Sequence, residues 1–159
     1  MSLAIRPARP GDAALVLQFV RELAAYEKLS HECAATEAMI DAALFGPETR
    51  LFCDIAEWNG EPVGNAIWFL NYSTFTGRHG VYLEDIFVRP AFRGQGIGKG
   101  LMVHLAQRCV SEGWTRFEWA VLNWNTPSID FYKSIGAELK DEWTICRVSG
   151  DALKRLAAR

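Results

Sequence analysis

The chain has 159 residues, of which half are hydrophobic and 23% are charged, as in one folded domain of ordinary size. Its formal net charge of −2 gives no electrostatic reason to expect nucleic acid as a partner. No apolar run approaches the roughly 20 residues of a membrane-spanning helix, and the N-terminus has no signal pattern. These features predict a single cytoplasmic domain over residues 1–159 that binds neither nucleic acid nor membrane.

The cysteines and histidines lack the spacing of metal ligands. They are scattered along the chain, with no Cys-x-x-Cys pair: Cys33, Cys53, Cys109 and Cys146, and His31, His79 and His104. We therefore expect no metal site, and free thiols in a reducing compartment.

The N-terminal third is expected to form a strand followed by two helices. Apolar residues at helical spacing follow Gly11-Asp12, and a second helix starts after a capping Thr36. The expected elements are a strand over Leu3–Pro7, a helix from Gly11-Asp12 to about Leu29, and a helix from Thr36 to Gly46-Pro47.

The middle of the chain changes to a strand pattern rich in β-branched and aromatic residues. Asn59-Gly60 is a strong hairpin signal between Leu51–Trp58 and Val63–Tyr72, and Val81–Val88 is a third strand. The remaining expected elements are a helix from Gly98 to Gly113, a strand over Arg116–Leu122, a short helix over Thr126–Ile135, a strand pair over Glu138–Leu139 and Thr144–Val148, and a closing helix over Asp151–Ala157. This order predicts an α/β fold, a mixed sheet with helices on both faces.

The most informative segment runs from the third strand of this series into the following helix. Three alternating glycines, Gly94, Gly96 and Gly98, open that helix after a strand ended by Pro90. Glycines let a backbone approach a ligand closely, and a helix N-terminus offers unpaired N–H groups, so the segment suits a phosphate. It is not a mononucleotide P-loop or a dinucleotide fingerprint, because the residues that those motifs require are missing at positions 93, 99, 100 and 101.

The pattern Arg-x-x-Gly-x-Gly that begins at Arg93 resembles the GNAT superfamily of N-acetyltransferases. The resemblance implies a mostly antiparallel central sheet, and acetyl-CoA as cosubstrate. It implies that the pyrophosphate binds at Arg93, Gly94, Gln95, Gly96, Ile97, Gly98 and Lys99, and that the pantetheine arm pairs like an added strand with the backbone of Ile86, Phe87 and Val88. The alternative is a glycine turn that only joins strand to helix.

A second segment, Asn123 to Ala137, resembles another GNAT element. In it Tyr132 matches the tyrosine beside the CoA sulfur, and Asn125 and Ser128 become expected cofactor contacts. When an amine attacks a thioester a thiolate must leave, and a nearby phenol can donate a proton to it. The alternative is that Phe131-Tyr132 is an aromatic pair that packs its helix on the sheet.

The similarity narrows to the diamine and polyamine acetyltransferases, the spermidine/spermine and thialysine branch, from Ile5 to about Trp143. It rests on Ile5-Arg6-Pro7-Ala8, Glu22 to Glu27, Tyr82-Leu83-Glu84-Asp85, the glycine motif and Asn125 to Lys133. A small cationic amine requires carboxylates among aromatic walls. The expected substrate residues are Tyr26, Glu27, Glu84, Asp85, Glu118 and Trp119.

Glu84 is also the expected base, because an ammonium is not nucleophilic and must lose a proton, here through a water. Strand alternation sends Glu84 and Asp85 to opposite faces unless a bulge intervenes. The alternatives are that Glu27 is a solvated helix-end charge and that Asp85 pairs with an arginine in the core.

Two departures from the branch leave the amine open. Asn123 stands where members acting on long polyamines have an acidic residue, and Glu118 stands where the branch often has His. A shorter amine or a lysine analogue is as plausible as spermidine, and the loop over residues 71–77 is a further substrate edge. Acetylation of a protein N-terminus or lysine, or acyl-CoA sensing without turnover, remain alternatives. The resemblance also implies a homodimer.

Overall fold

The computed structural model describes residues 1–158. Its contacts divide the chain into two compact units, Met1–Ala120 and Val121–Arg159. The expectation of a single domain stays a prediction.

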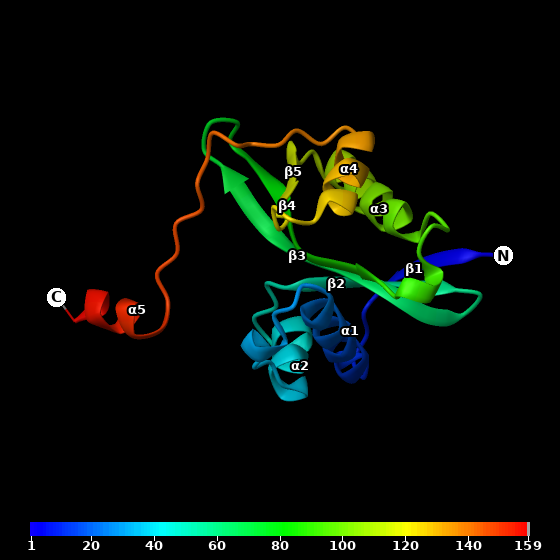
Figure 1. Ribbon diagram of the computed structural model, residues 1–159, viewed down its shortest axis with the longest axis horizontal. Coiled ribbons are helices and arrows are strands. Elements are labelled where there is room, and N and C mark those ends of the chain that lie inside the picture. Colours follow the sequence, from blue (N-terminus) through cyan, green and yellow to red (C-terminus); the bar gives the residue numbers. More distant parts are fainter. Residues whose placement is uncertain (159) are drawn as a thin grey trace. The chain divides into compact units, whose positions relative to one another are not determined.

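The first unit contains a five-stranded sheet (Figure 1). Its strands lie in chain order, β1-β2-β3-β4-β5; the first four pair antiparallel, and β5 pairs parallel to β4. The bounds are β1 Leu3–Pro7, β2 Phe52–Trp58, β3 Glu61–Ser73, β4 Arg78–Val88 and β5 Arg116–Trp119. The prediction of a mixed, mostly antiparallel sheet is confirmed.

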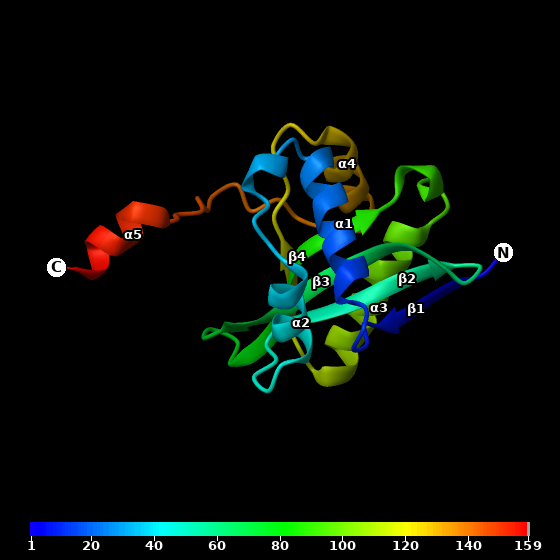
Figure 2. The ribbon, with the colours of Figure 1, turned by 90° about the horizontal axis from the view of Figure 1, so that it is seen from below.

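Helices cover both faces of this sheet (Figures 1 and 2). Helices α1 (Ala13–Tyr26) and α2 (Glu37–Phe45) lie on one face, and α3 (Ile97–Glu112) lies on the other. Short 3-10 turns lie between α1 and α2, at Ser30–Glu32, and between β4 and α3, at Pro90–Phe92. On the α1 face the buried core contains Val16, Leu44, Cys53, Ile55 and Ile67. Other fully buried side chains include Trp68, Leu83, Ile97, Leu101 and Leu105.

Local signals account for most element boundaries. Asn59 and Gly60 both have positive φ, 51° and 84°, which two-residue hairpins require. The Thr36 side chain accepts a hydrogen bond from the Met39 N–H at 3.3 Å and caps α2. Gly113 ends α3 in the left-handed conformation.

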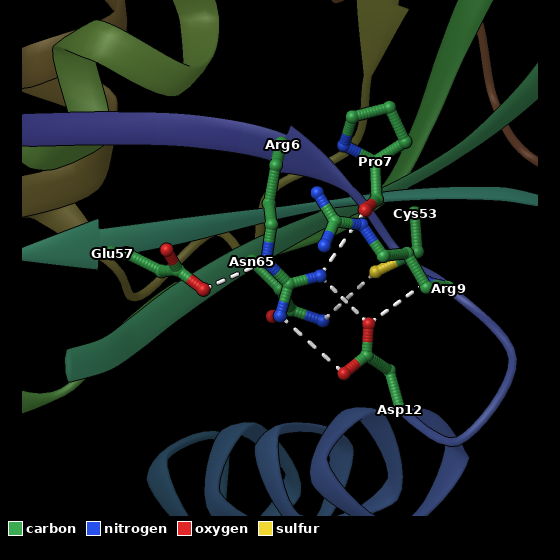
Figure 3. Close-up of polar contacts among 7 residues, drawn as sticks. All are labelled: Arg6, Pro7, Arg9, Asp12, Cys53, Glu57 and Asn65. Atoms are coloured by element: carbon green, nitrogen blue, oxygen red, sulfur yellow. Dashed lines mark hydrogen bonds and ion pairs between the residues drawn. The ribbon is translucent and has the colours of Figure 1, made fainter. Parts of the chain in front are cut away.

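An ion-pair network joins the start of α1 to the sheet (Figure 3). Arg6 on β1 donates to Asp12 at 2.7 Å and to Glu57 at 2.7 Å. Asp12 occupies the N-cap position of α1, but its side chain caps nothing. Its carboxylate accepts from Arg6 and from the Arg9 N–H instead, and these bonds, Arg6 first, hold its pKa below the usual range. The network fixes where α1 crosses the sheet.

The second unit contains α4 (Thr126–Ser134) and α5 (Gly150–Ala157). The predicted strands Glu138–Leu139 and Thr144–Val148 are wrong, because these residues form no strand in the described chain. Their β-branched side chains stay exposed, as at Ile145 and Val148, and a strand without a hydrogen-bonded neighbour is not stable by itself. In the first unit, β5 ends at Trp119, three residues before the predicted Leu122.

Candidate active site

A β-bulge breaks the alternation of β4 at Glu84. Leu83 lies across from Trp68 of β3, whereas Asp85 lies across from the adjacent Ile67, so Glu84 is the extra residue. Ile67 belongs to the core beneath α1, so Asp85 faces α1. Leu83 and Asp85 would share a face in a regular strand and here lie on opposite faces. From the sequence, strand alternation could be interrupted by a bulge at this position, and the structure contains that bulge.

Three carboxylates gather where the bulge meets the end of α1. Burial, then the negative charges of Glu84 and Glu27, raise the pKa of Asp85 to about 6. Burial also raises the pKa of Glu27, which ends α1 as its C-cap residue. Asp85 forms no ion pair among the described residues, so the alternative of a core arginine partner is not observed. Glu84 is exposed. In this acidic cluster (Glu27, Glu84 and Asp85), the charges that act on Asp85 are both negative.

Strand β4 also loses its pairing with β5 at the bulge. The parallel pairing with β5 ends at Leu83 and Trp119, but β4 continues to Val88. The Arg89 N–H donates to the Val63 carbonyl at 2.8 Å, which fixes the phase of the β3–β4 hydrogen bonds. In this phase Ile86 and Val88 direct their backbone groups away from β3, to an edge that β5 does not cover.

Phe87, the middle residue of the three expected to bind pantetheine, is different. It forms a hydrogen-bonded pair with Asn65, and its side chain is buried against Phe19 of α1, with ring centroids 6.3 Å apart. A Cβ on Gly64 would lie 2.4 Å from the Phe87 carbonyl oxygen, so glycine is required for this approach of β3 to β4. Phe87 therefore positions the edge, and Ile86 and Val88 form it.

The glycine loop that follows β4 has the conformation expected of an anion site. Gly94 and Gly96 have φ of 75° and 81°, and a Cβ on either would meet no atom within 4 Å. Gly96 is the N-cap residue of α3, and no side chain caps the helix. Backbone N–H groups of the first turn therefore face open space, as anion binding requires.

The side chains of this loop differ in exposure. Ile97 is buried in the core, so only its backbone can meet a ligand, whereas Gln95 and Lys99 are exposed. Gly98 lies within the first turn, 3.9 Å from Val88 as measured from an ideal Cβ. Arg93 precedes the loop and donates through Nε to the Val88 carbonyl at 2.9 Å. The residues present thus fit a pyrophosphate followed by an extended arm along β4.

Two further expected substrate residues of the first unit, Glu118 and Trp119, lie on β5. Trp119 ends this strand, across from Leu83 and next to the bulge. Glu118 lies across from Tyr82, and its carboxylate accepts from Asn71 at 2.8 Å and lies 3.7 Å from Arg116. Glu118 is thus held by Asn71 and Arg116 and is not among the charges that act on Asp85.

The second unit carries the other expected site residues, in α4 and at its N-cap. The Asn125 side chain accepts from the Ser128 N–H at 3.4 Å and caps α4, with Pro127 in the first turn. Tyr132 is 8% exposed, and its ring centroid lies 5.5 Å from that of Phe131. The sequence did not predict the capping role of Asn125, although Asn before Thr-Pro is a recognisable N-cap signal.

A further connection between α1 and the end of β4 was not predicted from the sequence. Arg89 forms a two-pronged ion pair with Glu22, at 3.1 and 3.2 Å, and donates to the Pro62 carbonyl at 3.1 Å. Its guanidinium also lies 4.9 Å from the centre of the Phe19 ring. These contacts secure α1 beside the strand that carries the acidic cluster.

Comparison with known proteins identifies the fold and family. Residues 17–137 match the acetyltransferase (GNAT) family. The chain is 40% identical to thialysine N-epsilon-acetyltransferase of Sus scrofa over 169 aligned positions, covering 99% of each chain. An integron cassette protein from Vibrio cholerae has 28% identity and a TM-score of 0.83, with 100% and 99% coverage.

A further solved structure resembles the chain in fold. It is AAC(6')-Iy in complex with a bisubstrate analogue of CoA, with a TM-score of 0.74, 20% identity, and coverage of 94% of this chain and 100% of that one. None of the described helices is long and apolar enough to cross a membrane. The family match spans three quarters of the chain. Acetyl-CoA, the acetyl donor of this family, has a pyrophosphate and an extended arm, the two groups that the glycine loop and the open edge of β4 fit. The chain is a member of the GNAT family of acetyltransferases, enzymes that use acetyl-CoA.

Proposed function

We propose that this enzyme transfers the acetyl group of acetyl-CoA to a primary amine of a small cationic substrate, a diamine, a polyamine or a lysine analogue such as thialysine. The acidic cluster carries the proposal. The charges that act on Asp85, those of Glu84 and Glu27, are both negative, and Asp85 lies where β4 leaves β5 and the expected pantetheine edge begins. A cationic substrate would offset this repulsion among carboxylates, whereas a neutral acceptor would not. The identity with a thialysine acetyltransferase supports the same substrate class.

Acetyl-CoA supplies the thioester, and the chain holds it in two ways. The backbone N–H groups of Gly94 to Lys99 and the Arg93 side chain bind the pyrophosphate, and the backbone of Ile86 and Val88 pairs with the arm. Phe87 supports this edge through its pairing with Asn65. Asn125, the N-cap residue of α4, and Ser128 in its first turn are the proposed contacts from the second unit.

The reaction is direct attack of the amine on the thioester carbonyl. Asp85 and Glu27 bind the cationic substrate, between the rings of Tyr26 and Trp119, with Glu118 at the outer limit of the pocket. Glu84 is exposed beside the open edge and accepts the ammonium proton through a water. The new N–C bond forms and the C–S bond breaks. The leaving thiolate takes a proton from the Tyr132 hydroxyl, and the second proton that the amine nitrogen loses on becoming an amide returns to the Tyr132 oxygen through solvent.

The first test is release of free CoA from acetyl-CoA with spermidine, spermine, putrescine, lysine, thialysine and a short peptide. The proposal expects turnover with at least one small amine and a drop in kcat/KM of about 100-fold or more in Glu84→Gln. Glu112→Gln, an exposed carboxylate at the end of α3, is the matched control and should leave turnover unchanged. Turnover of the peptide alone, or acetyl-CoA binding with no turnover on any amine, would overturn the proposed substrate class.

The same proposal includes assembly and location. The two compact units work as one acetyltransferase domain, since the family match over residues 17–137 crosses the boundary after Ala120. The enzyme acts as a homodimer in the cytoplasm, where its four free cysteines stay reduced. Light scattering after gel filtration tests the dimer, and a mass of 17.8 kDa would contradict it.

A further inference from the structure

The Arg93 side chain touches both the expected cofactor edge and the expected amine pocket. Its Nε donates to the carbonyl of Val88, the last residue of the open edge of β4. Its guanidinium carbon lies 4.8 Å from the centre of the Tyr26 ring and 5.7 Å from that of Phe87. Both distances fall within the range of cation–π contacts. One planar cation therefore joins the end of β4 to the end of α1.

These contacts leave the outer end of the guanidinium available. The two Nη groups of Arg93 make no hydrogen bond to any residue that the structure describes, and the side chain is exposed. They stand at the start of the glycine loop, where the left-handed Gly94 and Gly96 open the backbone to an anion. A guanidinium can stack on a ring and give its terminal N–H groups to a phosphate at the same time, which a lysine ammonium cannot do.

Tyr26 leads directly to the acidic cluster. It is the last residue of α1, and Glu27 follows it. The next residue, Lys28, has φ of 62°, a left-handed conformation uncommon outside glycine, so the chain turns sharply here. The Tyr26 ring therefore extends from the residue directly before Glu27, whose charge acts on Asp85.

We propose that Arg93 is a positioning residue that couples the two substrates: pyrophosphate bound to its Nη groups holds its guanidinium on Tyr26 and so orders the end of α1 for the amine. The inference rests on the proposed function, and it states how binding of the cofactor regulates binding of the amine. Binding of one ligand then strengthens binding of the other by the same factor, because coupling free energies are reciprocal. A loop that is already ordered costs the second ligand less conformational entropy.

The coupling is measured with CoA, which binds but cannot donate an acetyl group. Calorimetry gives the dissociation constant of CoA without amine and with a saturating concentration of amine. The amine used is one that the turnover assay has identified as a substrate. The inference expects CoA to bind about fivefold or more tightly with amine present. Tyr26→Leu removes the ring that Arg93 covers, and R93K keeps the charge without the planar stack. Both should lower this factor to about 1, while Tyr26→Phe keeps the ring and the coupling.

Two controls separate this effect from general damage. Glu22→Gln breaks the other connection between α1 and β4, the ion pair with Arg89, and should leave the coupling factor in place. Tyr26→Leu should bind CoA alone within about twofold of the wild type, since Tyr26 has no proposed contact with the cofactor. Wild-type coupling of 1, undiminished coupling in Tyr26→Leu, or loss of coupling in Glu22→Gln equal to that in Tyr26→Leu, would each overturn the inference.

A second measurement needs no amine and so distinguishes failure of this inference from failure of the proposed function. Hydrogen exchange of the segment over residues 25–29 is followed with and without CoA. The inference expects CoA to slow exchange there in the wild type and in Tyr26→Phe, and not in Tyr26→Leu or R93K. Equal exchange with and without CoA in the wild type contradicts it, whichever substrate the enzyme uses.

Discussion

Asp85 and Glu84 are consecutive carboxylates on one strand, and burial together with the charge of Glu84 raises the pKa of Asp85 to about 6. The bulge brings about this relationship, because it turns Asp85 to the α1 face directly after the exposed Glu84. An acid that titrates near 6 among other acids is typical of functional sites, since folding gains nothing from it.

The first prediction concerns the pH dependence of catalysis. Asp85 is charged above pH 6 and neutral below it, so its attraction for a cationic amine weakens as the pH falls through 6. We expect kcat/KM for the amine to fall with an inflection near 6, while KM for acetyl-CoA changes little. Asp85→Asn should lower kcat/KM about 10- to 100-fold at pH 7.5 and remove the inflection. A wild-type profile that stays flat between pH 5 and 7 would exclude this role.

The second prediction concerns stability. The folded protein binds the Asp85 proton more tightly than the unfolded chain, so this group favours folding at low pH and opposes it as the pH rises from about 4 to 6. Asparagine resembles the neutral acid. Asp85→Asn should therefore be more stable than the wild type by about 1–2 kcal/mol above pH 7, and equally stable below pH 4. Urea unfolding at both pH values measures the difference, and lower stability at pH 7 would contradict the cause assigned to the pKa.

The third prediction tests the glycine loop. Gly96→Ala places a Cβ on a residue with φ of 81°, which costs about 1 kcal/mol, and puts that atom in the space assigned to the pyrophosphate. We expect the dissociation constant of CoA to rise about tenfold or more. Gly60→Ala is the matched control, because Gly60 has φ of 84° and an equally open Cβ position in a hairpin far along the sequence. It should lose similar stability and keep its CoA affinity; equal CoA affinities in the two variants would contradict the site.

The fourth prediction tests the proposed acid. Tyr132→Phe keeps the ring that contacts Phe131 and removes the hydroxyl. We expect kcat to fall about 10²- to 10³-fold with a change of less than about twofold in CoA affinity. Ser111→Ala, which removes an exposed hydroxyl near the end of α3, serves as the control. Equal losses in kcat and in CoA binding would mean that Tyr132 holds the cofactor or the helix and does not act as the acid.

Much of the fold could be predicted because it depends on a few neighbouring residues at a time. Asn59-Gly60, Thr36 and Gly113 each set the backbone at one turn or helix end, and all three predictions are confirmed. Thr144–Val148 has strand-forming residues, yet forms no strand, because a strand also needs a neighbour to complete its hydrogen bonds. A local pattern specifies what a segment can form, and its partner decides whether it does.

The features of the site also fall into those that local sequence predicts and those that depend on distant residues. The glycine motif identified the loop because its function requires particular residues in sequence order. The bulge at Glu84 depends on the register of two strands, and the contact of Arg93 with Tyr26 joins residues far apart in the chain. Neither has a sequence signal of its own. The catalytic roles of Glu84 and Tyr132 stay predictions until variants are measured.

The open edge of β4 also has a consequence for handling the protein. Ile86 and Val88 present backbone groups that no strand of the first unit pairs, and such an edge is a template for any extended chain, including an unfolded copy of this one. Acetyl-CoA bound along it would take the place of that intruding strand. We therefore expect saturating CoA to suppress aggregation on heating, so that the cosubstrate acts as a protective cover as well as a reactant.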